Sequence, residues 1–276
     1  MGAPRRIGIT LGDPAGIGPE IVAKALASGR LDPQFAYEPI GDPRTKHRAD
    51  AAHWIVEGAS RCLRGELAAL VTAPISKPVL REAGYRYPGQ TEMLADLARV
   101  KKFAMLLVGG PLRVALVTTH LPLREVAAQI TTRRIVEVIE LTQAFCRQLG
   151  IARPKIGVAA LNPHAGDGGL FGTEEKRLIQ PAIKRTRATG PWPADTLFHK
   201  AYHGEFDAVV AMYHDQGLPP LKMIAFDSGV NVTLGLPFVR TSPDHGTAYD
   251  IAGKGVARPD SLIAAINLAA ELASKK

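Results

Sequence analysis

Short apolar runs alternate along the chain with longer stretches in which apolar residues recur at helical spacing. Strand-like runs, rich in β-branched residues, cover residues 6–11, 68–72, 103–108, 112–119, 155–163, 208–213 and 231–240. Helical periodicity covers residues 20–27, 49–64, 92–99, 123–129, 132–149 and 261–273. Buried strands are short and apolar, whereas helices are longer and amphipathic. The pattern therefore predicts an α/β fold.

Turn and capping residues define some of the boundaries. A Gly-Gly-Pro turn between the strands 103–108 and 112–119 predicts that they form a hairpin. Thr91 is placed to cap the helix 92–99. Residues 31–50 are rich in turn-forming residues, so we expect no regular structure there.

A histidine follows three of the predicted strands. These residues are His120, His164 and His214. Ligands of open parallel sheets bind outside the carboxyl ends of the strands, and three imidazoles with an open position are the usual layout of a catalytic divalent-metal site. Each could instead be a hydrogen-bonded loop histidine, because the three are far apart and form no local metal motif. Their shared position at strand ends favours the metal site.

The charge balance points to anionic small molecules rather than to nucleic acid. The chain has 34 basic and 26 acidic residues, a formal net charge of +8. The basic residues are dispersed, however, and aromatic residues make up only 6% of the chain, so the sequence offers neither a basic block nor a stacking platform. We therefore expect an anionic substrate and an anionic cofactor, and no nucleic-acid partner.

The sequence favours a cytoplasmic location. No apolar run is long enough to span a membrane, and the first residues lack the apolar core of a signal peptide. Cys62 and Cys146 have no C-x-x-C spacing, which fits a reducing compartment and argues against a disulfide framework. We expect no membrane partner.

Six motifs in the same order along the chain resemble the 4-hydroxythreonine-4-phosphate dehydrogenase family. They are G-D-P-A-G-I-G-P-E at 12–20, T-A-P-I-S-K at 72–77, L-N-P-H-A-G-D-G-G-L-F-G at 161–172, P-A-D-T-L-F at 193–198, Y-H-D-Q-G-L at 213–218 and H-G-T-A-Y-D-I-A-G-K-G at 245–255. The last motif also resembles the dinucleotide loop of isopropylmalate and isocitrate dehydrogenases. The resemblance covers nearly the whole chain.

The resemblance implies a homodimer of subunits with two α/β/α domains, as in isopropylmalate and isocitrate dehydrogenases. The active site would lie in the interdomain cleft and would be completed across the dimer interface. We expect residues 1–90 with 241–276 to form the first domain, which carries the cofactor loop. Residues 91–240 would form the second domain, with the metal ligands and the dimer interface.

The resemblance also implies roles for individual residues. It makes His120, His164 and His214 the metal ligands, and Gln90, Thr91, Lys222, Asn231 and Arg240 the substrate-binding residues. It assigns His245, Gly246 and Thr247 to the cofactor. The candidate catalytic residues are Asp195, Asp215 and Lys222, although a helix-capping or ligand-orienting role suits either aspartate equally well. Lys222 and Arg240 have the chemistry of an anion clamp.

The implied reaction is a metal-dependent oxidative decarboxylation of a 3-hydroxy acid. The preferred substrate is 4-phosphooxy-L-threonine (4-hydroxythreonine-4-phosphate), in pyridoxal phosphate biosynthesis. The cofactor would be NAD or NADP, and the metal zinc, with cobalt, nickel, iron or magnesium as alternatives. A divalent ion would act as a Lewis acid on the alcohol and on the decarboxylating keto acid.

Two departures from the family pattern leave the substrate open. Gln90 stands where the family has histidine, and the chain is shorter than usual between Gly41 and Thr72. A neutral amide at position 90 favours an alternative substrate without phosphate, such as a carboxylated aromatic cis-dihydrodiol of the terephthalate type. A metal-containing binding protein without turnover is a third possibility.

Overall fold

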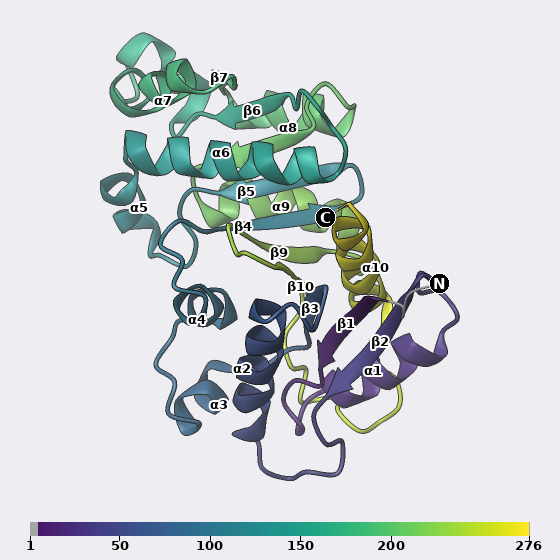
Figure 1. Ribbon diagram of the computed structural model, residues 1–276. Helices are drawn as coiled ribbons and strands as arrows, with labels where there is room; N and C mark the ends of the chain where they lie inside the picture. Colours follow the sequence, from purple (N-terminus) through teal and green to yellow (C-terminus); the bar gives the residue numbers. More distant parts are fainter. Residues whose placement is uncertain (1–4, 276) are drawn as a thin grey trace. The chain divides into compact units, whose positions relative to one another are not determined.

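The computed structural model describes residues 5–275 and divides into two compact units (Figure 1). The first unit combines residues up to Lys101 with Asp227–Lys276, and the second is Lys102–Phe226. The predicted domain boundaries at 90/91 and 240/241 differ from this division. Residues 91–101 and 227–240 lie in the first unit, because the helix that contains Thr91 packs on a helix of that unit and the strand after residue 229 pairs there.

The first unit contains five strands in the order β2-β1-β3-β10-β9. They are β1 (Arg5–Thr10), β2 (Phe35–Ile40), β3 (Ala69–Thr72), β9 (Val230–Leu234) and β10 (Val239–Pro243). All neighbours in this order pair in parallel except β9 and β10, which are antiparallel. β3, β9 and β10 are almost completely buried, as expected when helices cover both faces of a parallel sheet, whereas the edge strand β2 is mostly half-buried.

Five helices pack around these strands. They are α1 (Gly18–Ala27), α2 (Asp50–Leu63), α3 (Lys77–Glu82), α4 (Gln90–Leu97) and α10 (Asp260–Ser274). Thr241 donates a hydrogen bond to the Ala265 carbonyl of α10, whereas its neighbour Arg240 donates to Gln90 of α4. Because successive side chains of a strand point to opposite faces, α10 and α4 lie on opposite faces of β10.

The second unit contains five strands in the order β4-β5-β8-β6-β7. They are β4 (Ala104–Gly109), β5 (Leu112–Leu116), β6 (Ile156–Ala159), β7 (Thr189–Trp192) and β8 (Ala208–Ala211). β4 and β5 form the predicted antiparallel hairpin, and the other neighbours are parallel.

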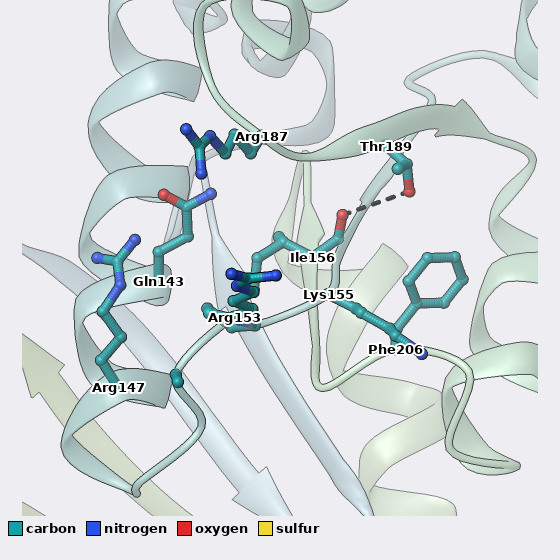
Figure 2. Close-up of a pocket in the computed structure, with 10 residues that line it drawn as sticks. Gln143, Arg147, Arg153, Lys155, Ile156, Arg187, Thr189 and Phe206 are labelled. Carbon is teal, nitrogen blue, oxygen red and sulfur yellow. Dashed lines mark hydrogen bonds between the residues drawn. The ribbon is translucent and has the colours of Figure 1, made fainter.

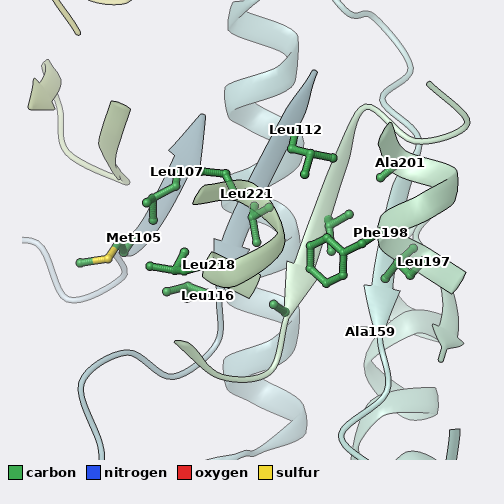
Figure 3. Close-up of a cluster of buried hydrophobic side chains, with 13 residues drawn as sticks. Met105, Leu107, Leu112, Leu116, Ala159, Leu197, Phe198, Ala201, Leu218 and Leu221 are labelled. Carbon is green, nitrogen blue, oxygen red and sulfur yellow. The ribbon is translucent and has the colours of Figure 1, made fainter. Parts of the chain in front are cut away.

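The helices of the second unit pack on these strands. They are α5 (Leu123–Gln129), α6 (Thr132–Gln148), α7 (Gln180–Arg185), α8 (Ala194–Tyr202) and α9 (His214–Ala225), with a π-helical segment, Glu175–Ile179, before α7. A cluster of buried apolar side chains from α8, α9 and the strands forms one core (Figure 3). Leu218 and Leu221 contribute to it from α9. No helix in residues 5–275 has the length and apolarity needed to cross a bilayer.

The structure corrects several predicted elements. Residues 31–50 contain the strand β2, and the single strand predicted at 231–240 is two strands, β9 and β10. Thr91 does not cap its helix, because α4 begins at Gln90 with Gly89 as its N-cap. The helix α9 was not predicted, since it contains Pro219 and Pro220. Burial of its apolar face outweighs the low helix propensity of proline.

Candidate active site

The carboxyl ends of three parallel strands in the second unit lie at one edge of the sheet. These strands are β5, β8 and β6, and the predicted metal ligands His120, His214 and His164 follow them in that order. The chain after β5 is bonded to the chain after β8, because the amide and the hydroxyl of Thr118 both donate to the Met212 carbonyl, the hydroxyl at 2.8 Å. This connection brings the loop of His120 beside His214.

Gln216 joins the end of β8 to the end of β6. Its side-chain carbonyl accepts from the Met212 amide at 2.7 Å, and its NH₂ group donates to the Ala160 carbonyl at 2.6 Å. The residue is buried, so these bonds are protected from water. Gln216 lies in the Y-H-D-Q-G-L motif, but no local pattern in the sequence indicates these contacts. We assign it the role of holding the strand ends that carry the histidines.

His120 and His214 form a pair. Their ring centroids are 5.5 Å apart, and both line a cavity of about 440 Å³ with Tyr213 and Asp215. His214 Nδ1 lies 2.6 Å from Asp215 Oδ1. A carboxylate beside one ring nitrogen fixes the tautomer and leaves the other nitrogen as a donor for a metal. The position of Asp215 suits the orienting role, one of the roles that the sequence left open.

His164 lies in a turn of unusual conformation. It belongs to the segment Pro163–Gly169, in which the five residues from His164 to Gly168 all have positive φ. A left-handed conformation costs about 1–2 kcal/mol per non-glycine residue, so other contacts must hold this segment. The buried Glu175 holds the chain just before it, because its carboxylate accepts from the amides of Leu161 and Asn162 at 2.9 and 2.8 Å. The amides of Leu170 and Phe171 donate to the carbonyls of Asp167 and Gly166 within the turn.

The three histidines do not converge within one chain. Among residues 5–275, no group of three or more His, Cys, Asp or Glu side chains is close enough to hold a metal ion. The pair His120 and His214, with the carboxylate of Asp215 on one of them, nevertheless has a donor set that suits a divalent transition metal.

In the first unit, Arg240 is a buried cation. It is 2% exposed and donates hydrogen bonds to Thr233, Thr72 and Gln90 at 3.0, 2.6 and 3.1 Å. All three acceptors are neutral, and within the part of the chain that the structure describes Arg240 has no carboxylate at salt-bridge distance. Its Nε is buried without a hydrogen-bond partner there. A guanidinium held in this way is prepared to bind an anion.

The environment of Arg240 has a measurable cost. Burial lowers the pKa of Arg240 from 12.5 to about 10, and the attraction of Glu92 offsets only part of this effect. A lowering of this size corresponds to roughly 3 kcal/mol of unfavourable desolvation at neutral pH. The buried side-chain oxygen of Asn231, on β9, also lacks a partner among the described residues. Two predicted substrate-binding residues thus carry unsatisfied polar atoms.

Gln90 and Thr91 belong to the same network. Gln90 accepts from Arg240 and donates to the Ala73 carbonyl at 3.3 Å. The hydroxyl of Thr91 lies 3.4 Å from that of Thr233. The amide at position 90 therefore positions the guanidinium. The sequence analysis missed Thr72 and Thr233, because a threonine inside an apolar strand carries no local signal of a polar contact across the sheet.

The remaining predicted catalytic residues lie elsewhere. Lys222 is on α9 in the second unit, with its ammonium 5.9 Å from the Phe226 ring centroid. Asp195 is exposed in the first turn of α8 and accepts from the amide of Thr196 at 2.8 Å, but it does not cap the helix, whose N-cap is Pro193. It does not line the cavity beside His120 and His214.

The predicted cofactor loop packs on the glycine-rich turn that follows β1. The amide of Ile17 donates to the Thr247 carbonyl at 2.9 Å, and a side chain at Gly16 would lie only 2.8 Å from the same oxygen. His245 Nε2 is buried and has no hydrogen-bond partner among the residues that the structure describes. The close approach of the Thr247 carbonyl explains the need for glycine at position 16.

A buried carboxylate holds this turn and the loop together. Asp13 is fully buried and accepts two hydrogen bonds from Arg48, at 3.1 and 2.7 Å, and one from the Tyr249 hydroxyl. Burial alone would raise the pKa of Asp13, but the bonds from Arg48, Tyr249 and the Ala15 amide outweigh it and lower the pKa below 3.8. The sequence analysis did not identify this network, because its members are far apart in sequence.

We expect Arg48→Ala to destabilise the protein at pH 7 by about 2–3 kcal/mol, because it leaves a buried carboxylate with less compensation. For a chain of this size the melting temperature should fall by roughly 5–10 °C. In the wild type the lowered pKa of Asp13 contributes stability above pH 3.8, which is lost as the pH falls through the folded-state pKa. Without Arg48, burial should raise that pKa, so the deficit should shrink between pH 7 and pH 4.

The measurement is thermal unfolding of both proteins across this pH range. Arg44→Ala is the matched control, since Arg44 is 89% exposed and pairs with an exposed aspartate. A deficit of the same size at both pH values, or an equal one in the control, would contradict the assignment of Asp13.

Known proteins resemble this chain over nearly its whole length. Residues 20–269 match the family model described as pyridoxal phosphate biosynthetic protein PdxA. The chain is 44% identical to a 4-hydroxythreonine-4-phosphate dehydrogenase of Geobacter metallireducens, over 98% of this chain and 96% of that protein. It is 40% identical to a D-threonate 4-phosphate dehydrogenase of Salmonella typhimurium, over 98% of this chain and 99% of that one.

A solved structure gives the same relationship. The crystal structure of a 4-hydroxythreonine-4-phosphate dehydrogenase from Klebsiella pneumoniae is 39% identical, with a TM-score of 0.85 over 98% of this chain and 99% of that one. The two-unit α/β fold is therefore shared along the whole length. The chain belongs to the PdxA family of pyridoxal phosphate biosynthetic proteins.

Proposed function

We propose that this protein catalyses the NAD(P)-dependent oxidative decarboxylation of 4-phosphooxy-L-threonine. The observation that carries the proposal is the buried guanidinium of Arg240, which has only neutral partners among the described residues. A phosphate ester would supply the missing negative charge and would accept from a planar fork of donors. Asn231 and Gln90 are the further substrate contacts of this proposal.

The chain's residues divide the chemical work. Arg240 would bind and orient the anionic end of the substrate, and Gln90 and Thr233 hold the guanidinium in place. The imidazoles of His120, His214 and His164 would hold a divalent ion. When bound, that ion supplies Lewis acidity toward the alcohol oxygen and toward the carbonyl that forms as hydride is lost. Asp215 fixes the orientation of the His214 ring.

The dihydrodiol alternative is not supported. It rested on the neutral amide of Gln90, but in the structure this amide accepts from Arg240 and leaves the cation in place. The relatives at 40–44% identity described above are both named for phosphate esters of four-carbon acids. D-threonate 4-phosphate is the second candidate substrate, because one of these relatives is named for it.

The test is a comparison of kcat/KM for 4-phosphooxy-L-threonine, D-threonate 4-phosphate and their forms without phosphate. Loss of the phosphate removes charge-assisted hydrogen bonds worth about 1.5–3 kcal/mol each. We therefore expect kcat/KM to fall by about a hundredfold or more for the dephosphorylated compounds. Equal rates with and without the phosphate would exclude a phosphate-binding role for Arg240. The ratio between the two phosphate esters decides which is the substrate.

We also propose that His245, Gly246 and Thr247 bind the nicotinamide cofactor, NAD or NADP. Support comes from the buried, partnerless Nε2 of His245 and from the packing of this loop on the turn after β1. We expect His245→Ala to raise the KM for the cofactor by about tenfold, as for the loss of one hydrogen bond to a charged group. The KM for the substrate should change little. A rise confined to the substrate KM would show that the cofactor binds elsewhere.

Three further properties are part of the proposal. The metal is zinc, which accepts imidazole ligands readily. The active form is a homodimer, since Met223 on α9 is 90% exposed and Phe226, just after this helix, is 75% exposed. The partner copy completes the metal site, since His164 lies apart from the other two histidines in the single chain. The reaction takes place in the cytoplasm, where the buried thiols of Cys62 and Cys146 would remain reduced.

A further inference from the structure

A second cavity lies in the second unit, at the amino-terminal ends of the strands, whereas the histidines follow the carboxyl ends. Its volume is about 360 Å³. Ile156 and Thr189, which line it, are the first residues of the parallel strands β6 and β7. His164 follows the carboxyl end of β6, so the length of that strand separates the cavity from it. The cavity is therefore a different place from the candidate active site.

The cavity is surrounded by positive charge. Its lining includes Arg147, Arg153, Lys155 and Arg187, which come from α6, from the segment before β6 and from the segment before β7 (Figure 2). Within residues 5–275 none of the four forms a salt bridge. Asp207, which follows the lining residue Phe206, accepts from the backbone amide of Lys155 at 2.7 Å. One carboxylate does not balance four neighbouring cations, which repel one another, and a bound anion would reduce that repulsion.

A buried polar group also lines the cavity. Gln143 is 9% exposed, and no hydrogen-bond partner for its side-chain amide occurs in the part of the chain that the structure describes. It stands one helical turn before Arg147 on α6, and both line the cavity together with Arg153 and Arg187 (Figure 2). Because this amide faces the cavity, it can donate to or accept from a ligand there. It therefore adds a neutral hydrogen-bonding group to the four cations.

The remaining lining is apolar. Ile156 is fully buried, and Pro154 and the ring of Phe206 complete this side of the cavity. We propose that this cavity binds a small phosphate ester with a flat apolar body. The phosphate would be held by Arg147, Arg187 and the Gln143 amide, and the body would pack against Phe206. The volume is at the lower end of the range for small-molecule sites, which favours such a compound over a nucleic-acid strand.

The probe for the test is phenyl phosphate, titrated calorimetrically into the full-length protein. Three proteins are compared: the wild type, Arg147→Gln/Arg187→Gln, and Lys184→Gln/Arg185→Gln. The last pair removes the same charge from exposed positions of α7 that do not line the cavity. Gln143→Leu is a fourth protein, which lacks the amide at nearly constant volume. Activity toward the substrate and the melting temperature report whether each variant is folded.

We expect the wild type and the α7 variant to bind phenyl phosphate alike, and Arg147→Gln/Arg187→Gln to bind it at least about tenfold more weakly. Gln143→Leu should weaken binding severalfold, and phenol should not bind at all. Binding that is unchanged in Arg147→Gln/Arg187→Gln would place phenyl phosphate at the active site and overturn the proposal, as would an absence of binding to the wild type. A single-stranded oligonucleotide that competes with phenyl phosphate more strongly than inorganic phosphate does would identify the cavity as part of a nucleic-acid surface instead.

Discussion

Replacing His214 by alanine is expected to reduce kcat/KM by at least about a thousandfold, because loss of a metal ligand removes the Lewis acid that stabilises the developing charge. The bound metal should be lost in parallel. The fold should survive, since the imidazole is 36% exposed and lies outside the apolar core. The measurements are steady-state kinetics, metal content and the melting temperature. His199→Ala is the control, because His199 is an exposed histidine on α8 in the same unit.

A mixing experiment tests the proposed sharing of the metal site between two copies. His164→Ala and His214→Ala should each be inactive alone. If His164 of one copy completes the pair of the other, a hybrid dimer keeps one intact site of its two. Random mixing after dissociation makes about half of the dimers hybrid, so activity should return to roughly a quarter of the wild-type value. No recovery in a mixture that contains hybrids would mean that each chain supplies all of its own ligands.

We expect Arg240→Met to reduce activity without reducing the stability of the protein, whereas most substitutions of buried residues reduce stability. The variant removes a buried cation whose desolvation costs roughly 3 kcal/mol, and it replaces it by an apolar side chain of similar length. We expect kcat/KM for the phosphorylated substrate to fall by at least a hundredfold, through loss of the charge-assisted bonds. The ligand-free protein should melt at the same temperature or higher, because exchange of a buried charge for an apolar group is often neutral or stabilising.

The control for this prediction is Thr233→Val, which removes one acceptor of the guanidinium and leaves the charge. This variant should be less stable than the wild type, since a buried donor loses its partner, and it should bind the substrate only moderately more weakly. A melting temperature of Arg240→Met several degrees below that of the wild type would show that the hydrogen bonds of Arg240 outweigh the cost of its burial.

Much of the fold was predictable, because long amphipathic segments and short apolar runs carry their own periodicity. The helices at 123–129 and 132–149 and the hairpin of β4 and β5 agree with the structure. The misses have tertiary causes. Pro39 lies inside β2, and β2 is an edge strand of the sheet. A missing amide hydrogen is tolerated in an edge strand. The prolines of α9 are tolerated because Leu218 and Leu221 pack into the core.

The candidate site was predictable only in part. The strand-end position of His120 and His214 follows from the parallel sheet, and the structure places the two rings together. The residues that hold these groups were invisible in the sequence. Gln216, Glu175 and Thr72 are ordinary polar residues whose partners lie in other elements, so no local spacing marks them. The left-handed turn at His164 was likewise missed, because no local pattern indicates a positive φ at the non-glycine residues His164, Ala165 and Asp167.

The division of the chain into two units also sets the order in which the protein can be completed during synthesis. The second unit is one continuous segment, so all of its strands are available once Phe226 has left the ribosome. The first unit begins earlier but receives β9, β10 and α10 only from residues 227–276. Until then β3 has an unpaired edge, which can pair with other chains. Residues up to Lys101 therefore carry an exposed strand edge through most of synthesis, and β10 covers it only after the whole second unit has been made.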